Sequence, residues 1–529
     1  MVNQIRSLSY FVESNGAKEG TADFEKAIKL CGYGRFHYGF LLLCGAMFLC
    51  VGCQNGINAY ILPSAECDLK LTSEQKGLLN VSFLLGGVIS AIFWGVFADA
   101  YGRKYILLLT LLSDSILSIG GSFSQSFKVL LLFRALSGFF IGAPGSLVYT
   151  YLGEFHAEKQ RVRSICYVGL FWTISWLILP GLAWIIIPLP ISLQFNGMLY
   201  NSWRIFLAII GIPTLMVTLV ATAYPESPKF LVSQGKTEEA LAILRKIYAL
   251  NTGHHEDEYP VKILLPDDTM NSHNDKASFA ASGVLTELLK NIWQQMRCLG
   301  SPPLLKYALL CCCIYFANMF GYYGFGLWLP ELFNRFENYH NLHPNRTASV
   351  CKLMHEPELK TAMPSAKNIL VDSTSVMNDC SHNMDEMVFI NSLTINAFCL
   401  LGNVISGYMA NRVGRRTMPV TTMLLAGVFG FAIYFVRSSL QILMVSCMFS
   451  LTIVTANFVI SSIVVDIFPT NVGAVAICIV TCFGRIGAIA SNLAFGMLLD
   501  ISCEVPIFLV GSIVILGGAL ALVLPKKKS

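Results

Sequence analysis

The sequence predicts an all-α membrane protein that crosses the bilayer about twelve times in two related halves. Three observations lead to this prediction. Of the 529 residues, 54% are hydrophobic and only 13% are charged, whereas a soluble protein carries about 25% charged residues. Apolar runs of about 20 residues, the length that a bilayer core requires, recur along most of the chain. A short basic loop motif also recurs once. Within lipid, helices satisfy every backbone hydrogen bond internally, so we expect helical spans.

The apolar runs form two sets of six, so the predicted fold is 12 transmembrane helices in two six-helix bundles. They cover residues 38–62, 77–98, 105–122, 129–152, 165–187, 204–224, 307–329, 387–409, 418–435, 441–464, 472–498 and 507–524. The predicted organisation is an N-terminal segment 1–37, a first bundle 38–224, a linker 225–306, a second bundle 307–525 that includes a loop at 331–385, and a tail 526–529.

Lys and Arg gather in alternate loops, at Arg103–Lys104, Arg161–Arg163, Arg415–Arg416 and Lys526–Lys528. Cytoplasmic loops carry such an excess, so we expect both termini in the cytoplasm. The net charge of +5 is explained by these loops and does not indicate a nucleic-acid partner. No cleavable signal peptide is evident, and we expect the first span to direct insertion.

The loop 331–385 falls on the extracytoplasmic side in this orientation. It contains Asn345-Arg346-Thr347, an acceptor pattern for N-glycosylation at Asn345. A disulfide is possible on the same side. The cysteines available for it, whose pairing the sequence leaves open, are Cys67, Cys351, Cys380 and Cys503.

The linker 225–306 is polar, and part of it has the spacing of an amphipathic helix. In Thr237–Tyr248, apolar residues recur three to four positions apart. They are Ala240, Leu241, Leu244 and Ile247. The following stretch, His254–Asp275, is rich in Asp, His and Pro, and we interpret it as a mobile linker.

The basic loop after the second span is repeated after the eighth. Gly95–Lys104 aligns with Gly407–Arg416, every matched position being offset by 407 − 95 = 312 residues. Glu154, at the end of the fourth span, aligns with Asp466 at the same offset. The constant offset predicts two duplicated bundles of the same orientation. Membrane transporters that are built from duplicated halves usually place the substrate between the halves.

These loops suggest a cytoplasmic gate. Gly95 and Gly407 would let helices approach closely, and Gly102 and Gly414 would allow a tight turn. Asp99 could pair with Arg103 or cap a helix of the facing half. Glu154 could pair with Arg161 or with the basic cluster. The alternative is a static anchor of Lys and Arg. The predicted gate comprises Gly95, Asp99, Gly102, Arg103, Lys104, Glu154, Arg161, Glu226, Gly407, Asn411, Gly414, Arg415, Arg416 and Asp466.

The chain resembles the major facilitator superfamily, and within it the synaptic vesicle glycoprotein 2 family and sugar or organic-cation porters. The superfamily motifs are the two basic loops, Arg134–Gly142, Tyr151–Glu154, Pro225–Lys229 and Asp466–Thr470. The closer resemblance is carried by Gly32–Gly39, Leu62–Glu66, Gly181–Pro188, Ser202–Arg204, Gly321–Gly324 and Trp328–Pro330. It implies a major facilitator fold and a place in the plasma membrane or in a secretory or synaptic-type vesicle.

The chain departs from that family at positions where the family has acids. Val51 and Gln54 stand at two acidic positions of the first span, and Asn457 and Ser461 at a Trp and an acid of the tenth. The resemblance therefore does not extend to proton or cation coupling.

Polar and aromatic residues within the spans are candidates for a substrate cavity, since polar groups in apolar spans usually face the interior. Neutral amides and phenols suit a polar, uncharged or aromatic solute, and Trp184 matches a Trp that, by resemblance, lines a drug-binding cavity. The predicted cavity comprises Gln54, Asn55, Asn58, Arg134, Trp172, Trp184, Asn318, Tyr322, Tyr323, Asn457 and Arg485.

Each of these residues has an alternative structural role. Asn and Tyr side chains also join helices, and Trp172 and Trp184 could form an aromatic belt. Arg134 could snorkel to the interface, and Arg485 could bond helix carbonyls. Asp114, in the third span, is a possible proton site, but a structural hydrogen bond is the favoured interpretation.

Nothing in the sequence indicates an enzyme. It contains no Gly-rich phosphate loop with Lys and no Cys or His spacing suited to zinc, so we expect no cofactor and no metal site. We predict a monomeric secondary transporter that moves a small polar organic solute by alternating access. The alternative is a non-transporting membrane protein of the same fold that acts on vesicle protein partners as a trafficking regulator or receptor.

Overall fold

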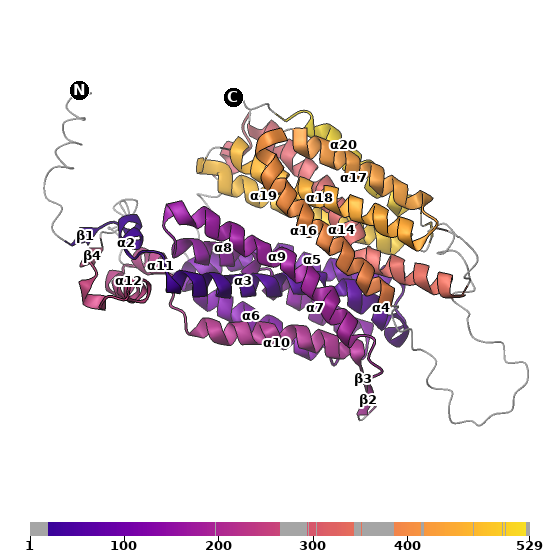
Figure 1. Ribbon diagram of the computed structural model, residues 1–529, viewed down its shortest axis with the longest axis horizontal. Helices are drawn as coiled ribbons and strands as arrows, with labels where there is room; N and C mark the ends of the chain where they lie inside the picture. The colour runs from indigo at the N-terminus through magenta and orange to yellow at the C-terminus, as the bar shows by residue number, and fades with distance from the viewer. Residues whose placement is uncertain are drawn as a thin grey trace, which may run out of the picture.

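The computed structural model describes residues 20–524, except 196, 265–293, 295, 303, 343–350, 352–385, 414–416, 469, 500 and 503. Long helices form two bundles that lie side by side, the N-terminal one indigo to magenta and the C-terminal one orange to yellow (Figure 1). The first bundle contains α3 (Arg35–Gly56), α4 (Asn58–Leu69), α5 (Ser73–Tyr101), α6 (Arg103–Gly121), α7 (Phe127–Ile141), α8 (Pro144–Glu154), α9 (Glu158–Ile186) and α10 (Ser202–Thr222). The second contains α14 (Leu304–Leu342), α16 (Glu386–Val413), α17 (Thr417–Phe435), α18 (Ser439–Ile467), α19 (Thr470–Leu498) and α20 (Glu504–Ala521).

The number of membrane spans agrees with the sequence prediction. Among the described residues, eleven helices are long and apolar enough to cross a membrane, or twelve if the bent pair Ser73–Ser90 and Phe93–Tyr101 is one span. Two spans are each built from two helices in succession, α3 with α4 and α7 with α8. The second break precedes Pro144, which has no backbone N–H to continue α7.

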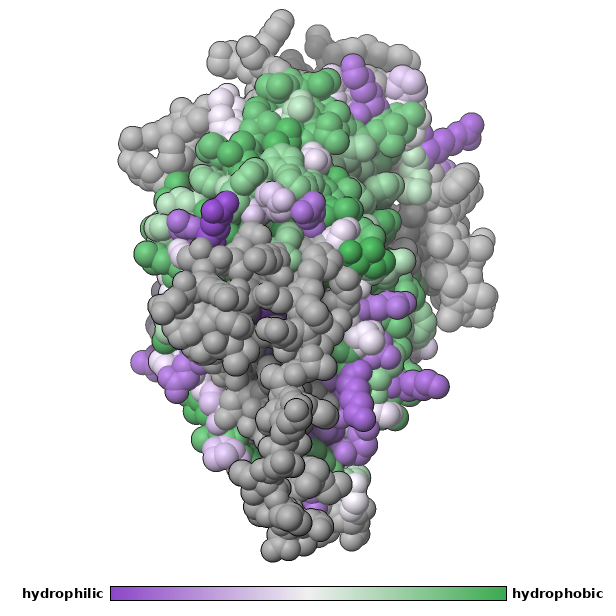
Figure 2. Space-filling model, turned by 90° about the vertical axis from the view of Figure 1, so that its right-hand side faces the viewer, coloured by the Kyte–Doolittle hydropathy of each residue, from purple (hydrophilic) through white to green (hydrophobic). Residues whose placement is uncertain are grey.

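The outer surface of the bundles is apolar, as a lipid-facing surface must be. Large hydrophobic side chains on it are more than half exposed, among them Leu42, Ile116, Met216, Phe435 and Leu516. Figure 2 shows broad hydrophobic areas in green on the flanks of the molecule. The chain is therefore an integral, multi-pass membrane protein.

The molecule has two ends along the direction of its long helices, and we name each end by its residues. The motif end carries the turn at Gly102, and the far end carries the link from Leu69 to Ser73. A hairpin of β2 (Ser192–Phe195) and β3 (Met198–Asn201) also lies at the far end, on the right in Figure 1. The two halves meet where α5 packs against α19 and where α9 packs against α16.

A small cap covers the motif end of the first bundle. It contains β1 (Thr21–Ala22), α2 (Phe24–Leu30), α11 (Pro228–Ser233), α12 (Thr237–Thr252), the short 3₁₀ helix η1 (Glu256–Glu258) and β4 (Ile263–Leu264). The four residues that α12 buries are the four apolar residues of the predicted amphipathic helix, which is thereby confirmed.

The prediction of a mobile linker from His254 is wrong for the part that the structure describes. β4 pairs in parallel with β1, and the buried Tyr259 hydroxyl donates to the carbonyl of Ala27 at 2.6 Å. Burial of the Tyr259 ring in the cap orders this stretch, although most of the residues around it are polar. Residues 265–275 of the predicted linker lie outside the described residues.

Candidate functional site: a cavity between the two halves

A cavity of about 480 Å³ lies between the two bundles, and both contribute to its walls. This volume lies within the range of small-molecule sites. Side chains of α3, α5, α7, α8 and α9 meet side chains of α14, α18 and α19 there. The lining residues are Phe48, Val51, Asn55, Phe83, Leu84, Gly87, Gly138, Ile141, Gly142, Gly145, Tyr149, Trp172, Tyr315, Met319, Tyr322, Tyr323, Asn457, Thr481, Arg485 and Ala488.

Six of the eleven residues predicted for the cavity line it. They are Asn55, Trp172, Tyr322, Tyr323, Asn457 and Arg485. Several other lining residues were not predicted, although helical spacing could have identified them. Tyr315, Met319 and Tyr322 share one face of α14, at positions i, i+4 and i+7. Thr481 and Ala488 flank Arg485 on α19 in the same way.

Gln54 and Arg134 do not line the cavity, contrary to prediction. Both side chains are buried within the first bundle. Arg134 donates from Nη1 to Gln54 Oε1 at 3.0 Å and from Nη2 to the Gln54 carbonyl at 2.9 Å, and its guanidinium lies over the Phe83 ring at 4.4 Å. Gln54 donates in turn to Ser118 Oγ at 2.6 Å. These bonds tie α3 to α6 and α7 and satisfy polar groups that lipid could not.

Asp114 belongs to the interior of the same bundle. It is fully buried and accepts a hydrogen bond from Ser137 Oγ at 2.6 Å. It does not line the cavity. The structural hydrogen bond that the sequence analysis favoured is present, and the placement gives no support to a proton site.

Three further predicted residues also lie outside the cavity. Trp184 is 38% exposed on the surface, where an indole suits the lipid interface. Asn58 and Asn318 are buried in helix packing. The Asn318 amide has no hydrogen-bond partner among the described residues. Periodicity alone could not separate these positions from the cavity, because the inner faces of a bundle point both to neighbouring helices and to the cavity.

The far end of the cavity is closed by charges that the sequence analysis did not single out. Lys76 of α5 is 1% exposed, and its Nζ lies 2.8 Å from Glu331 Oε1 of α14 and 2.8 Å from Glu66 Oε2 of α4. Arg335 Nε binds the same Glu331 oxygen at 2.7 Å. The predicted spans 77–98 and 307–329 ended just short of both residues. The structure corrects these bounds, since α5 begins at Ser73 and α14 continues to Leu342, through the first residues of the predicted loop 331–385.

Between these charges and the cavity, contacts of uncharged residues also join the two halves. Asn80 Nδ2 of α5 donates to Asn492 Oδ1 of α19 at 3.0 Å, and Trp328 Nε1 donates to the same oxygen at 3.1 Å. A Cβ atom on Gly77 would lie 2.8 Å from the Gly496 Cα, so the two helices touch through their backbones. Tyr322 and Trp176 then meet at 6.2 Å between ring centroids.

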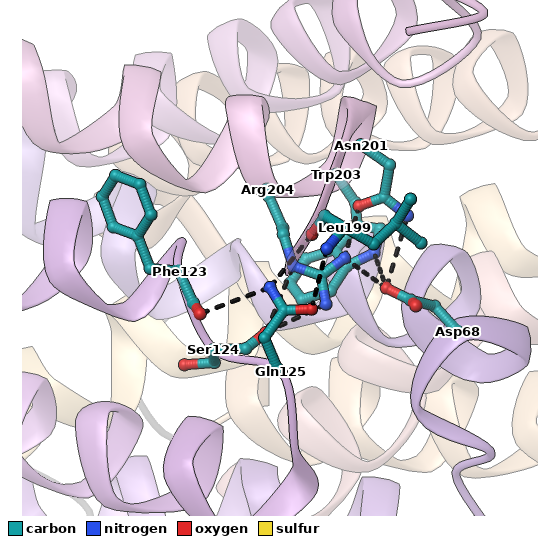
Figure 3. A network of polar contacts seen from close by, with 8 residues as sticks. All are labelled: Asp68, Phe123, Ser124, Gln125, Leu199, Asn201, Trp203 and Arg204. Atoms are coloured by element: carbon teal, nitrogen blue, oxygen red, sulfur yellow. Dashed lines mark hydrogen bonds and ion pairs between the residues drawn. The ribbon is translucent and has the colours of Figure 1, made fainter. Parts of the chain in front are cut away.

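A second polar cluster at the far end lies wholly within the first bundle (Figure 3). The Asp68 carboxylate accepts from Arg204, from Trp203 Nε1 at 3.1 Å and from Asn201 Nδ2 at 3.3 Å. Arg204 also donates to the carbonyl of Ser124 at 2.9 Å. The cluster joins the end of α4, the α6–α7 link and the start of α10. It therefore stabilises one half without joining it to the other.

At the motif end, the predicted gate residues are brought together, and their described partners all lie in the first half. Arg103 pairs with Asp99 at 2.8 Å and with Glu154 at 3.2 Å. Glu226 Oε1 accepts from the backbone N–H of Lys104 at 3.0 Å, and the Lys104 ammonium donates to the Thr222 carbonyl at 2.8 Å. Gly102 has φ +104°, which explains why glycine occupies the turn.

Other gate predictions need correction or lie outside the described side chains. A Cβ atom on Gly95 would meet nothing within 4 Å, so this glycine serves no close helix contact. Arg161 does not pair with Glu154 but binds Glu25 Oε1 at 2.6 Å and the Gly153 carbonyl at 3.0 Å. Side chains of the second copy of the motif are not described, namely Gly407, Asn411, Gly414, Arg415, Arg416 and Asp466.

The structure describes only some of the residues predicted to lie on the extracytoplasmic side. Cys351 is disulfide-bonded, but the side chains of Cys67, Cys380 and Cys503 lie outside the described residues. Asn345 lies outside them as well. No group of three or more His, Cys, Asp or Glu residues within the described chain could hold a metal ion.

Comparison with known proteins finds relatives that align with nearly the whole chain. The family described as "Sugar (and other) transporter" matches residues 51–299. Synaptic vesicle glycoprotein 2C of Rattus norvegicus is 27% identical over 97% of this chain and 81% of its own length. Synaptic vesicle glycoprotein 2B of Homo sapiens is 25% identical over 96% of this chain and 86% of its own length.

Solved structures show the same fold. The inward-open form of the xylose transporter XylE from E. coli superimposes with a TM-score of 0.63 at 14% identity, covering 93% of this chain and 97% of that one. Its partially occluded inward-open form gives a TM-score of 0.62, also at 14% identity, and covers 93% and 100%. These similarities confirm the predicted two-bundle, twelve-helix fold.

Proposed function

We propose that the chain, which is similar to the sugar transporter family and to the synaptic vesicle glycoprotein 2 proteins, is a member of the major facilitator superfamily and a secondary transporter of a small polar organic solute. The observation that carries the proposal is the cavity of about 480 Å³ whose walls come from both bundles. A site at the interface of two halves is the arrangement that alternating access requires, because rocking of the halves exposes it first at one membrane face and then at the other.

The contacts at the far end give this cycle a physical barrier. Opening that end would separate Lys76 from Glu331 and Asn80 from Asn492. Both contacts join the first bundle to the second and are buried. Water would have to replace the lost partners, so the closed state is favoured until binding energy shifts the equilibrium.

We place the motif end in the cytoplasm, on the distribution of Lys and Arg. Both termini then lie in the cytoplasm, and Asn345 is an extracytoplasmic glycosylation site. We further propose a monomer in the plasma membrane or in a secretory vesicle. The linker and its cap, with α11 and α12 packed together at the motif end, would form a cytoplasmic domain.

Uptake into liposomes tests the proposal. The purified chain is reconstituted and offered labelled sugars, amino acids, organic cations and organic anions. We expect saturable uptake of at least one class. Asn80→Cys combined with Asn492→Cys should allow a short, reducible bis-methanethiosulfonate to fix the far end shut, abolishing uptake until dithiothreitol is added. Each single cysteine variant is the matched control and should transport with or without the reagent.

One observation favours a second candidate function. Among the described residues, no Asp or Glu lines the cavity. A transporter-like protein without coupling acids could act as a receptor or trafficking regulator through vesicle protein partners. Folded protein that takes up none of the four solute classes would contradict transport and favour this second function.

A further inference from the structure

Arg485 is the only charged side chain that lines the cavity in the described part of the chain. It lies within α19, between Gly484 and Ile486. Nothing acidic balances it, since the described residues show no ion pair for it and no Asp or Glu lines the walls. A cation in a site shielded by lipid and protein is costly unless it is paired, so this arrangement calls for an explanation.

A purely structural role accounts for only part of the guanidinium. Arg485 donates from Nη1 to the carbonyl of Gly87 on α5, across the boundary between the halves. A guanidinium has five N–H donors in a planar fork, and this bond uses one of them. A fork with free donors facing a cavity is suited to a carboxylate or another planar anion, which it can bind through two parallel hydrogen bonds.

The rest of the lining describes the body of the ligand. Aromatic side chains line the cavity from both halves, among them Tyr315, Tyr322 and Tyr323 on α14 and Trp172 on α9. Tyr322 and Tyr323 stand edge to face, with ring centroids 5.1 Å apart. Asn457 and Thr481 add hydrogen-bonding groups to the same lining. Such walls favour a flat, apolar or aromatic body with few polar substituents.

We infer that the ligand of this cavity is a small organic anion, a carboxylate on an aromatic body, whose charge is held by Arg485. The inference rests on the proposed function, because it names the class of solute for the same site. It narrows the expectation from the sequence, where neutral amides and phenols suggested an uncharged solute. The unbalanced charge of Arg485 favours an anionic solute over the other two classes. An uncharged solute would leave Arg485 unpaired, and a cation would be repelled.

Binding, measured separately from uptake, tests the inference. The full-length chain in nanodiscs is titrated by calorimetry with benzoate and indole-3-acetate, and with their uncharged analogues benzamide and indole-3-acetamide. We expect each acid to bind about tenfold or more tightly than its amide, the loss typical of a charge-assisted hydrogen bond. Arg485→Gln should remove this preference, and Arg485→Lys should keep part of it. Arg437→Gln, at an exposed arginine outside the cavity, is the matched control and should bind as the wild type does.

Two results would overturn the inference. One is that neither acid binds, or that the amides bind as tightly as the acids. The other is that a folded Arg485→Gln variant, verified by its thermal unfolding, keeps the preference for the acids. Failure of the transport proposal looks different. Acids that bind through Arg485 but are never taken up contradict transport alone, whereas uptake of an uncharged or cationic solute that is independent of Arg485 contradicts the anion alone.

Discussion

The two ends of the molecule differ in whether a described ion pair joins the two halves, although the far end also holds the Asp68–Arg204 pair within the first half. At the far end, Lys76 of the first half pairs with Glu331 of the second. At the motif end, Arg103 pairs with Asp99 and Glu154, both in its own half. A contact between halves must break when the halves separate, whereas a contact within a half can persist through the cycle. Closure therefore depends on the contacts between halves at the far end, whereas the described contacts of the motif end make the first bundle rigid.

The largest effect is expected from Lys76→Met. The substitution leaves Glu66 without its cation and Glu331 with Arg335 alone. Loss of one partner from a buried pair costs about 3–5 kcal/mol, and we expect the lower end of this range because Arg335 remains. Because the pair joins the halves, much of this should appear as opening of the far end. We expect a cysteine at Asn80 to react faster with a membrane-impermeant thiol reagent in the Lys76→Met background. Unchanged labelling would contradict the role in closure.

Arg103→Gln should have a smaller effect of a different kind. It leaves Glu154 poorly paired near the surface, and we expect a loss of about 2 kcal/mol in the free energy of unfolding. Labelling of the Asn80→Cys reporter should not change, because both partners of Arg103 lie in the first half. Faster labelling would mean that the motif end controls the far end, and the comparison would then fail.

Gly77→Ala tests the backbone contact between the halves. The new methyl would lie 2.8 Å from the Gly496 Cα, and overpacking of this kind costs about 1–3 kcal/mol. We expect faster labelling of the reporter with little change in thermal stability, because the halves can separate to relieve the clash. Gly95→Ala is the matched control on the same helix, where the added Cβ meets nothing within 4 Å. It should leave labelling unchanged.

The smallest effect is a pH dependence of stability at the motif end. Burial lowers the pKa of His156 to about 4, although its bond to the Leu152 carbonyl opposes the shift. The unfolded chain takes up this proton near pH 6.5. Stability from the neutral imidazole is therefore complete above about pH 6.5 and is lost as the pH falls toward 4.

His37 and Arg161 lie near His156, and their charges also lower its pKa. The substitution His156→Gln removes the titrating imidazole and so measures its contribution to the pH dependence of stability. We expect the difference in melting temperature between pH 7 and pH 5 to be smaller in the variant than in the wild type. Equal differences in the two proteins would show that other groups account for the pH dependence.

Composition and repetition were enough to determine the membrane class, the two-bundle fold and the amphipathic helix at Thr237. Those features depend on the length of apolar runs and on helical period, which the chain carries locally. Six of the eleven predicted cavity residues also line the cavity, because polar and aromatic residues in spans tend to face inward.

The tertiary structure alone decided which inward face each residue joins. Gln54 and Asn55 are neighbours, yet Gln54 binds Arg134 inside the first bundle and Asn55 faces the cavity. The same holds for the closure, where Lys76 and Glu331 are 255 residues apart. Such pairings depend on how helices rotate and pack against one another, and a helix is free to rotate about its axis until its neighbours are in place.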